Sequence, residues 1–213
     1  MTQNVHVSSH PLVAHKISLL REKSTPAKQV RELLREIGQL LMYEATADLS
    51  TKPAGRGEGE VADFEKASLA ESVAYVPVLR SGLSLLDAGL ELIPSATVHH
   101  LGLYRDSYTL APIEYYNKLP DRPTHSLYIV LDPMIATGGT ASAVLAILKD
   151  WGVTRVKLVS VCASKKSLDS LQKQYPEAQI YVGAMDETLN DQGYVVPGIG
   201  DSGDRLYKTP HVE

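Results

Sequence analysis

The feature that most constrains the fold is a regular alternation of β-type and helical patterns from position 73 onward. Strands are predicted in residues 73–80, 97–105, 126–133, 155–163 and 179–185, with a turn and helix in 81–94, a helix ending at Trp151 and a helix through 167–175. Strands joined through helices pair in parallel, and such sheets carry helices on both faces. We therefore predict an α/β fold with a largely parallel sheet flanked by helices, and ligands beyond the carboxyl ends of its strands.

An amphipathic helix is predicted nearer the N-terminus, with Thr25 as its cap and Pro26 at its first position. Its apolar positions recur at helical spacing: Val30, Leu33, Leu34, Ile37, Leu40 and Leu41. The chain has 213 residues, of which 44% are hydrophobic, which is enough for one sizeable core. We expect a single domain over residues 1–213.

Three segments interrupt these patterns. Residues 50–65 are rich in glycine and charge, so we expect a mobile excursion or a hairpin. Residues 106–120 are polar and aromatic and lie between two predicted strands, which indicates a projecting arm or lid. Residues 193–209 form a glycine-rich tail that either is flexible or holds a ligand close to its backbone.

Composition excludes several classes of function. The net charge of −4 and the absence of a lysine or arginine block argue against nucleic-acid binding. No stretch approaches the length of a membrane span, and the first residues do not resemble a signal peptide. Cys162 is the only cysteine and lies in an apolar run, so we expect a buried, inert thiol in a reducing compartment. We expect a cytoplasmic protein.

The segment YIVLDPMIATGGTASAVLAIL, residues 128–148, combines an acid with a glycine pair. Asp132 falls at the end of a predicted strand, and Thr137, Gly138, Gly139 and Thr140 fall where a helix begins. Unpaired N–H groups and the positive end of the helix dipole favour a phosphate there, and Asp132 can accept hydrogen bonds from ribose hydroxyls. The turn therefore indicates a ribose 5-phosphate site; a plain connection is the alternative. The fingerprints G-x-x-x-x-G-K-S/T and G-x-G-x-x-G are absent, which excludes the corresponding nucleotide sites.

The motif DPMIATGGT at residues 132–140 resembles the phosphoribosyl-pyrophosphate loop of type I phosphoribosyltransferases, and its Asp-Pro-Met opening resembles the uracil phosphoribosyltransferases in particular. Similar segments occur at 10–21, 43–49, 76–83, 101–106, 114–120 and 193–205. The resemblance implies a type I phosphoribosyltransferase fold with an N-terminal helix, a projecting β-arm and a C-terminal base-binding tail. It also implies transfer of the phosphoribosyl group of 5-phospho-α-D-ribose 1-diphosphate (PRPP) to uracil, giving UMP and pyrophosphate, usually with Mg²⁺.

The resemblance also implies roles for individual residues. Asp132 contacts the ribose hydroxyls, residues 136–140 cradle the 5-phosphate, and Arg80 and Arg105 bind pyrophosphate. The residues expected to bind PRPP are Arg80, Arg105, Asp132, Pro133, Met134, Ile135, Ala136, Thr137, Gly138, Gly139, Thr140 and Asp201. Those expected to bind uracil are Val195, Gly200, Asp201 and Ser202, and those expected to act in catalysis are Asp201, Arg80 and Arg105. Without the resemblance, Arg80 reads as a surface arginine and Arg105 as a partner of Asp106.

Some positions depart from the family pattern. Pro133 replaces the second acid of many type I enzymes, so no residue is assigned as a metal ligand and Mg²⁺ is expected to be bound through PRPP and water. Ser107, Tyr108 and Ala111 stand where acids are usual in the arm. Ser202 replaces the usual alanine and Lys208 the usual glycine, but neither change removes a backbone N–H group.

Two rival functions remain open at this point. One is a pyrimidine-sensing regulator on the same fold, which would need a basic face. The other is a transferase for a different base. The chemistry itself needs no covalent nucleophile, because loss of pyrophosphate leaves an oxocarbenium-like centre that uracil N1 attacks. We expect a homo-oligomer, dimer or tetramer, and leave regulation by GTP open.

Overall fold

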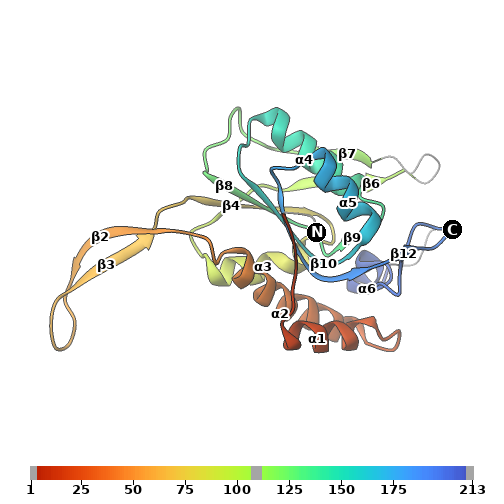
Figure 1. The fold of residues 1–213 in the computed structure, drawn as a ribbon, viewed down its shortest axis with the longest axis horizontal. Helices are drawn as coiled ribbons and strands as arrows, with labels where there is room; N and C mark the ends of the chain where they lie inside the picture. Colours follow the sequence, from red (N-terminus) through yellow and green to blue (C-terminus); the bar gives the residue numbers. More distant parts are fainter. Residues whose placement is uncertain (1–3, 107–111, 210–213) are drawn as a thin grey trace.

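The computed structural model describes residues 4–106 and 112–209, and a nine-stranded sheet forms the centre of this part (Figure 1). Its main path is β1 (Val5–Val7), β11 (Gln179–Asp186), β10 (Val156–Ser164), β8 (Leu127–Leu131), β4 (Val73–Leu79), β6 (Leu101–Arg105) and β7 (Pro112–Asn117). The short strands β5 (Thr97–Val98) and β9 (Met134–Ile135) pair with β4 and β10. Among the described strands of this sheet, only β7 runs antiparallel to its neighbour. The predicted, largely parallel sheet is confirmed.

Helices cover both faces of the sheet. Figure 1 shows α1 (Pro11–Arg21), α2 (Ala27–Ala45) and α3 (Leu83–Leu92) on one face, and α4 (Gly139–Trp151) and α5 (Lys165–Gln174) on the other. In β4, Val73 and Tyr75 join the core on the first face, whereas Ala74, Val76 and Val78 join the core on the second. Successive strand side chains point to opposite faces, so a strand between two helical layers is apolar throughout.

Among residues 4–106 and 112–209, no helix is both long enough and apolar enough to cross a bilayer.

At three places the structure differs from what the sequence patterns predicted. Pro26, not Thr25, is the N-cap of α2, and the Thr25 hydroxyl instead donates to the carbonyl oxygen of Leu19 at 2.8 Å. The predicted strand 97–105 is divided into β5 and β6, with an interruption at His99 and His100. The elements β1 and α1 were not predicted as a strand and a helix from periodicity.

The glycine-rich segment after α2 forms a hairpin, as one of the two predicted alternatives. Strands β2 (Thr51–Gly57) and β3 (Phe64–Leu69) pair antiparallel in a separate two-stranded sheet. Figure 1 shows this hairpin extending away from the central sheet. Most of its side chains are exposed.

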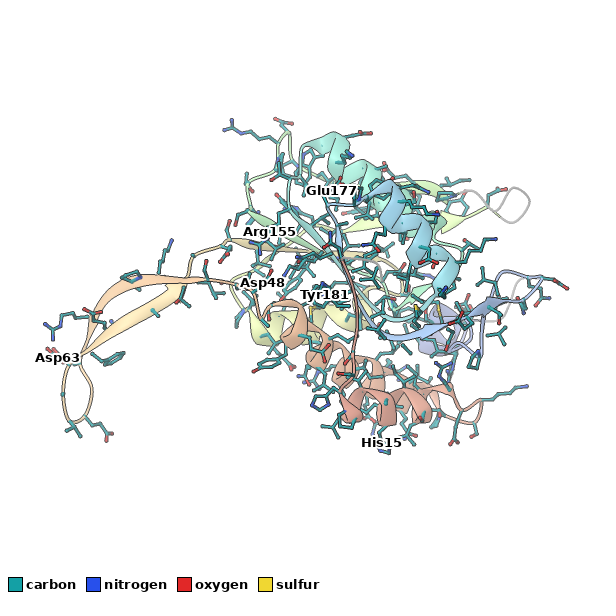
Figure 2. All side chains as sticks on the ribbon, in the orientation of Figure 1. His15, Asp48, Asp63, Arg155, Glu177 and Tyr181 are labelled. Carbon is teal, nitrogen blue, oxygen red and sulfur yellow. The ribbon has the colours of Figure 1, made fainter. Side chains whose placement is uncertain are left out.

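The base of the hairpin is tied to β10 by charged residues (Figure 2). Arg155 bonds Asp48 at 3.1 Å and Glu71 at 3.3 Å, and Glu71 accepts from the backbone of Ser50. Lys157 is fully buried and donates to the Ala45 carbonyl at 2.7 Å as well as to Asp48. A buried ammonium needs such partners, because an unpaired charge away from water is costly. The hairpin therefore leaves the domain from a fixed base.

His99 lies in a cluster of rings beside the edge of α4. Its ring centroid lies 6.0 Å from that of His125, 6.2 Å from Tyr128 and 5.8 Å from Trp151. The Nε2 atom of His99 is buried and has no hydrogen-bond partner within the described part of the chain. Burial, and then the charges of His125 and His100, lower the pKa of His99.

The lowered pKa of His99 predicts a loss of stability in mild acid. Below about pH 6.5, His99 binds a proton in the unfolded chain but resists protonation in the folded state. The free energy of unfolding therefore decreases as the pH is lowered through that range. His99→Gln should reduce this fall, measured by urea unfolding at about pH 7.5 and about pH 5.5, on either side of the ordinary histidine pKa. His15→Gln, at an exposed position of α1, is the control and should retain the parent's pH dependence. A His99→Gln protein as pH-dependent as the parent would contradict the assignment.

Candidate active site

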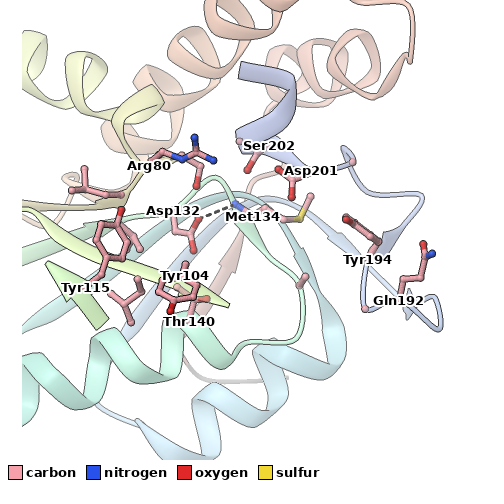
Figure 3. A pocket seen from close by; sticks show the side chains of 18 residues that line it. Arg80, Tyr104, Tyr115, Asp132, Met134, Thr140, Gln192, Tyr194, Asp201 and Ser202 are labelled. Carbon is pink, nitrogen blue, oxygen red and sulfur yellow. Dashed lines mark hydrogen bonds between the residues drawn. The ribbon is translucent and has the colours of Figure 1, made fainter. Parts of the chain in front are cut away.

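A cavity of about 810 Å³ opens at the carboxyl ends of β4 and β8 (Figure 3). Four parts of the chain surround it: the turn after β4, the turn after β8, strands β6 and β7, and the C-terminal tail. The lining residues are Val78, Leu79, Arg80, Ser81, Leu103, Tyr104, Tyr115, Asp132, Met134, Ala136, Thr140, Gln192, Gly193, Tyr194, Gly200, Asp201, Ser202 and Gly203. This is the position at which open α/β sheets bind ligands.

The turn after β8 leads from an acid to the start of α4. Asp132 follows Leu131 directly and is only 7% exposed. The carbonyl of Pro133 accepts from the backbone N–H groups of Val161 and Cys162, both at 3.1 Å. The turn is thereby fixed to β10, and Asp132 is held at the edge of the cavity.

The carbonyl side of the same turn is held by the first residues of α5. The Ser164 hydroxyl donates to the carbonyl oxygen of Ala136 at 2.7 Å, and Ser167 donates to that of Ile135 at 3.3 Å. In a trans peptide the N–H group points away from the carbonyl, so the next N–H groups face away from α5. The carbonyls of Ile135 and Ala136 are thereby fixed on the α5 side of the turn.

The two glycines of this turn differ in what the fold demands. Gly138 has a φ of +85°, and a Cβ there would lie 3.0 Å from the Cβ of Ser167. At Gly139 the atoms of residues 4–106 and 112–209 within 4 Å of an added Cβ are Thr137 Oγ1 at 3.8 Å and Pro112 Cδ at 3.9 Å. Gly138 is required by the backbone, whereas this described part of the chain leaves space for a methyl group at Gly139.

The turn after β4 carries Arg80 and approaches β8 closely. A Cβ on Gly82 would lie 2.3 Å from the Leu131 carbonyl oxygen and 2.5 Å from the Val78 nitrogen, so only glycine fits. The guanidinium carbon of Arg80 lies 5.8 Å from the centre of the Tyr207 ring, and the Tyr207 hydroxyl donates to the Arg80 carbonyl at 3.2 Å. Arg80 is thus positioned by contacts with α6 (Ser202–Tyr207) as well as by its own turn.

The β6–β7 side contributes two tyrosines to the cavity. The Tyr104 and Tyr115 rings lie 6.0 Å apart between centroids, and each side chain is about half exposed. The register shifts between Gly102 and Leu103, and a Cβ on Gly102 would lie 2.7 Å from the Tyr115 ring. A bulge and a glycine therefore make room for the Tyr115 ring over β6.

Part of the predicted arm cannot be compared with the structure. Arg105 ends β6, and its side chain lies outside the described part. Ser107, Tyr108 and Ala111 also lie outside the described residues.

The tail enters the cavity at its last helix. Asp201 is the N-cap of α6, where its carboxylate accepts from the Asp204 N–H at 2.9 Å. Gly200 has a φ of +71°, and Ser202 is 8% exposed. The helix ends at Tyr207, and its C-cap, Lys208, adopts a left-handed φ of 54°. This is the position at which the sequence resemblance leads us to expect glycine.

The predicted site residues are not all placed alike. Those that line the cavity are Arg80, Asp132, Met134, Ala136, Thr140, Gly200, Asp201 and Ser202. Thr137, Gly138 and Gly139 form the adjoining turn, whereas the side chains of Ile135 and Val195 lie in the hydrophobic cores. Tyr104, Tyr115, Gln192 and Tyr194 line the cavity but were not predicted. The aromatic pair in the EYYNKLP segment was the one sequence signal for Tyr115.

The charged groups of the cavity are opposite in sign on its different walls. Figure 3 shows Arg80 above Asp132 and Asp201 on the side of the tail. Among residues 4–106 and 112–209, no three histidine, cysteine, aspartate or glutamate side chains gather in a metal-binding arrangement. The cavity can thus receive a ligand that carries both anionic groups and hydroxyl groups.

Cys162 belongs to the core beneath the site. The thiol is buried and donates to an Asp186 carboxylate oxygen at 3.1 Å. Burial, with the neighbouring Asp186, raises the pKa of the Cys162 thiol. The predicted burial of the Cys162 thiol is confirmed.

Comparisons with known proteins agree with the geometry. The family model described as uracil phosphoribosyltransferase matches residues 7–209. The uracil phosphoribosyltransferase of Roseiflexus sp. (strain RS-1) is 48% identical over 205 residues, covering 96% of this chain and 98% of the relative. That of Dictyoglomus thermophilum is 46% identical over 211 residues, covering 96% and 99%. The solved structure of the AQ2163 protein from Aquifex aeolicus has a TM-score of 0.91 at 36% identity, covering 97% of this chain and 99% of that one.

Proposed function

The chain belongs to the uracil phosphoribosyltransferase family, and we propose that both of its substrates bind in the cavity between the β4 turn, the β8 turn and the tail. The enzyme transfers the phosphoribosyl group of PRPP to uracil and forms UMP and pyrophosphate, and its fold is that of the type I phosphoribosyltransferases. Three turns distant in sequence supply Arg80, Asp132 and Asp201 to one cavity. This convergence supports the placement of the substrates most directly.

We assign the ribose 5-phosphate to the turn after β8. The N–H groups at the start of α4 and the hydroxyls of Thr137 and Thr140 are suited to the phosphate. Asp132 is suited to the ribose hydroxyls, because a carboxylate accepts hydrogen bonds from neutral donors. Residues 133–135 connect these two contacts and fix the turn to β10.

We assign the pyrophosphate of PRPP to Arg80 and Arg105. A guanidinium can donate two parallel hydrogen bonds to phosphate oxygens and offsets the charge that grows on the leaving group. Stabilisation of that charge favours loss of pyrophosphate from C1′, which gives the ribose its oxocarbenium character. The anion is thereby held while the base approaches the other face of the reaction centre.

We assign uracil to the backbone of the tail at Val195 and residues 200–202. Uracil presents two carbonyl acceptors on either side of an N–H donor, and backbone N–H and C=O groups can match this pattern. Asp201 lies between the base and PRPP in this assignment. Its role is to position the reactants so that N1 attacks C1′.

Mg²⁺ is the cofactor that we propose. Asp132 and Asp201 both line the cavity, so the residues present fit an ion carried in on PRPP and held mainly by phosphate oxygens and water. The ion would supply positive charge beside the leaving group. Asp201 is the carboxylate of the tail that would help to hold it.

We further infer one domain over residues 1–213, a cytoplasmic location and a homo-oligomer. The buried free thiol of Cys162 fits a reducing compartment. The projecting β2–β3 hairpin carries Val61, 99% exposed, and Phe64, 52% exposed, which fits association with another copy. Light scattering should give two or four times the 23.2 kDa mass of one chain. A monomeric mass would contradict the oligomer.

The base site predicts strong selection for uracil. Cytosine reverses the hydrogen-bonding polarity at two positions of the ring edge, so a fixed backbone should reject it by about 10⁴-fold in kcat/KM. Purified protein with Mg²⁺ should form UMP from uracil and PRPP and should also accept 5-fluorouracil, because position 5 lies off this edge. Ser202→Ala is the control and should keep the preference, since its N–H is unchanged. Absence of UMP would refute the function, and cytosine used within about tenfold of uracil would refute backbone recognition.

Gly139 and Arg80 are predicted to act on opposite ends of PRPP. Gly139→Ala places a methyl group where the 5-phosphate is assigned. It should weaken the binding of both UMP and PRPP by about tenfold or more, as for loss of a charge-assisted hydrogen bond. Arg80→Ala should weaken PRPP binding by a similar amount but leave UMP binding unchanged, because UMP has no pyrophosphate. Isothermal titration calorimetry of both ligands tests this division. Thermal melting of Gly139→Ala should match the parent because the fold has room for the methyl group; equal loss of UMP affinity in both variants would contradict the division.

A further inference from the structure

Asp186 lies at the end of β11 and gathers hydrogen bonds from three parts of the chain. It is 8% exposed. Arg21 at the end of α1 donates to both carboxylate oxygens, at 2.8 and 2.9 Å, in a bidentate pair. The backbone N–H of Gly198 donates to Asp186 Oδ2 at 3.0 Å, and the thiol of Cys162 at 3.1 Å. A carboxylate this buried is stable only because its oxygens are paired.

Gly198 is held on both sides by this pair. Its N–H is bonded to Asp186, and its carbonyl accepts from Arg21 Nη1 at 3.1 Å. Its φ is +55°, and a Cβ would lie 2.2 Å from the Val195 carbonyl oxygen. Gly198 is therefore the point at which a tight turn of the tail is fixed, between Val195 and Gly200.

The tail beyond Gly198 rests on the same N-terminal helices. Arg205 donates to the carbonyls of Ile199 at 2.8 Å, Leu20 at 2.5 Å and Glu22 at 2.9 Å. Arg31 of α2 donates to the carbonyl of Leu206 at 2.8 Å. Guanidinium–carbonyl hydrogen bonds thus anchor the tail on both flanks of residues 200–202: Arg21 and Arg31 bond tail carbonyls, and Arg205 bonds carbonyls at the end of α1.

We propose that Asp186 and Arg21 are positioning residues for the base: they fix Gly198, and through it the backbone groups at residues 200–202 that read uracil. The inference rests on the proposed base site. Neither residue lines the cavity, so neither contacts the substrates. Recognition by backbone depends on N–H and C=O groups held within a fraction of an ångström, and second-layer hydrogen bonds provide such rigidity.

The charge state of the pair agrees with this role. Desolvation raises the pKa of Asp186, but hydrogen bonds from Arg21 and Cys162 outweigh it, so the pKa of Asp186 lies below its usual range. The carboxylate is ionised at neutral pH and accepts from all its donors at once. Asparagine has the same shape but replaces one acceptor with a donor, which faces Arg21 or the Gly198 N–H.

Asp186→Asn should therefore affect uracil and PRPP unequally. We expect KM for uracil to rise by about tenfold or more, as for loss of a hydrogen bond to a charged group, with KM for PRPP within about twofold. The ratio of kcat/KM for uracil over cytosine should fall, because a looser backbone can adapt to the wrong base. Arg21→Lys keeps the charge but cannot bridge Asp186 and Gly198 with a planar fork, so it should show the same changes to a smaller extent.

Glu36→Gln is the matched control. It removes the 2.6 Å ion pair between Lys16 of α1 and Glu36 of α2, which does not touch the tail, and should leave both KM values and the base ratio unchanged. If Asp186→Asn does not fold, Arg21→Lys decides the outcome by the same ratio. Folded variants with unchanged KM for uracil, or with both KM values raised together and the base ratio intact, would overturn the inference. A parent enzyme that forms no UMP, or does not select uracil, would instead refute the proposed function itself.

Discussion

Parallel pairing of β4 with β8 brings together the two turns assigned to PRPP. The register places Pro77 opposite Leu131, so the strands end at the same edge and the turns bearing Arg80 and Asp132 emerge side by side. The missing side chain at Gly82 allows the first turn to lie against the backbone of β8. Side chains alternate between the two faces of β4, so a slip of one residue would move each of them into the opposite core. Packing of the two cores therefore fixes the geometry of the cavity.

The second half of the cavity depends on polar contacts rather than on strand pairing. The tail follows a short antiparallel pair, β12 (Thr188–Leu189) with β13 (Val195–Val196), and then runs over α1 and α2. Arginine side chains hold its carbonyl groups, and Asp186 holds Gly198. The half assigned to phosphate is built on the sheet itself, whereas the half assigned to the base is built on hydrogen bonds between the N-terminal helices and the tail. Each half is thus fixed by a different kind of interaction.

The sequence allowed the sheet and the phosphate turn to be predicted, because both depend on local patterns. Valine-rich runs followed by helical spacing predict parallel strands, and a glycine pair at a helix start predicts either an anion site or a plain connection. The split at His99 was missed because β5 and β6 pair with β4 in one continuous register, so the local pattern is that of a single strand. The Thr25 cap was wrong because its hydroxyl found a partner in Leu19, before the helix.

The site residues divide along the same line. Arg80, Asp132 and Asp201 could be placed by resemblance because their motifs are contiguous. Tyr115 lines the cavity at the bulge opposite Gly102 and Leu103, a break in register that the sequence pattern does not indicate. The Arg21–Asp186 pair joins positions 165 residues apart, and both residues also bond the backbone of Gly198, a contact that no sequence pattern encodes. Long-range polar contacts of this kind become visible only in the folded chain.

The anchoring of the tail on α1 and α2 has a consequence for the order in which the enzyme matures. The hydrogen bonds from Arg205 to Leu20 and Glu22 span more than 180 residues. Contacts of such separation close only after the intervening chain has been made and ordered. During synthesis, the turn at residues 132–140 leaves the ribosome well before residues 198–206. The part of the cavity assigned to phosphate can therefore exist on a nascent chain, whereas the part assigned to uracil is completed only after that later segment is released and docks on the N-terminal helices.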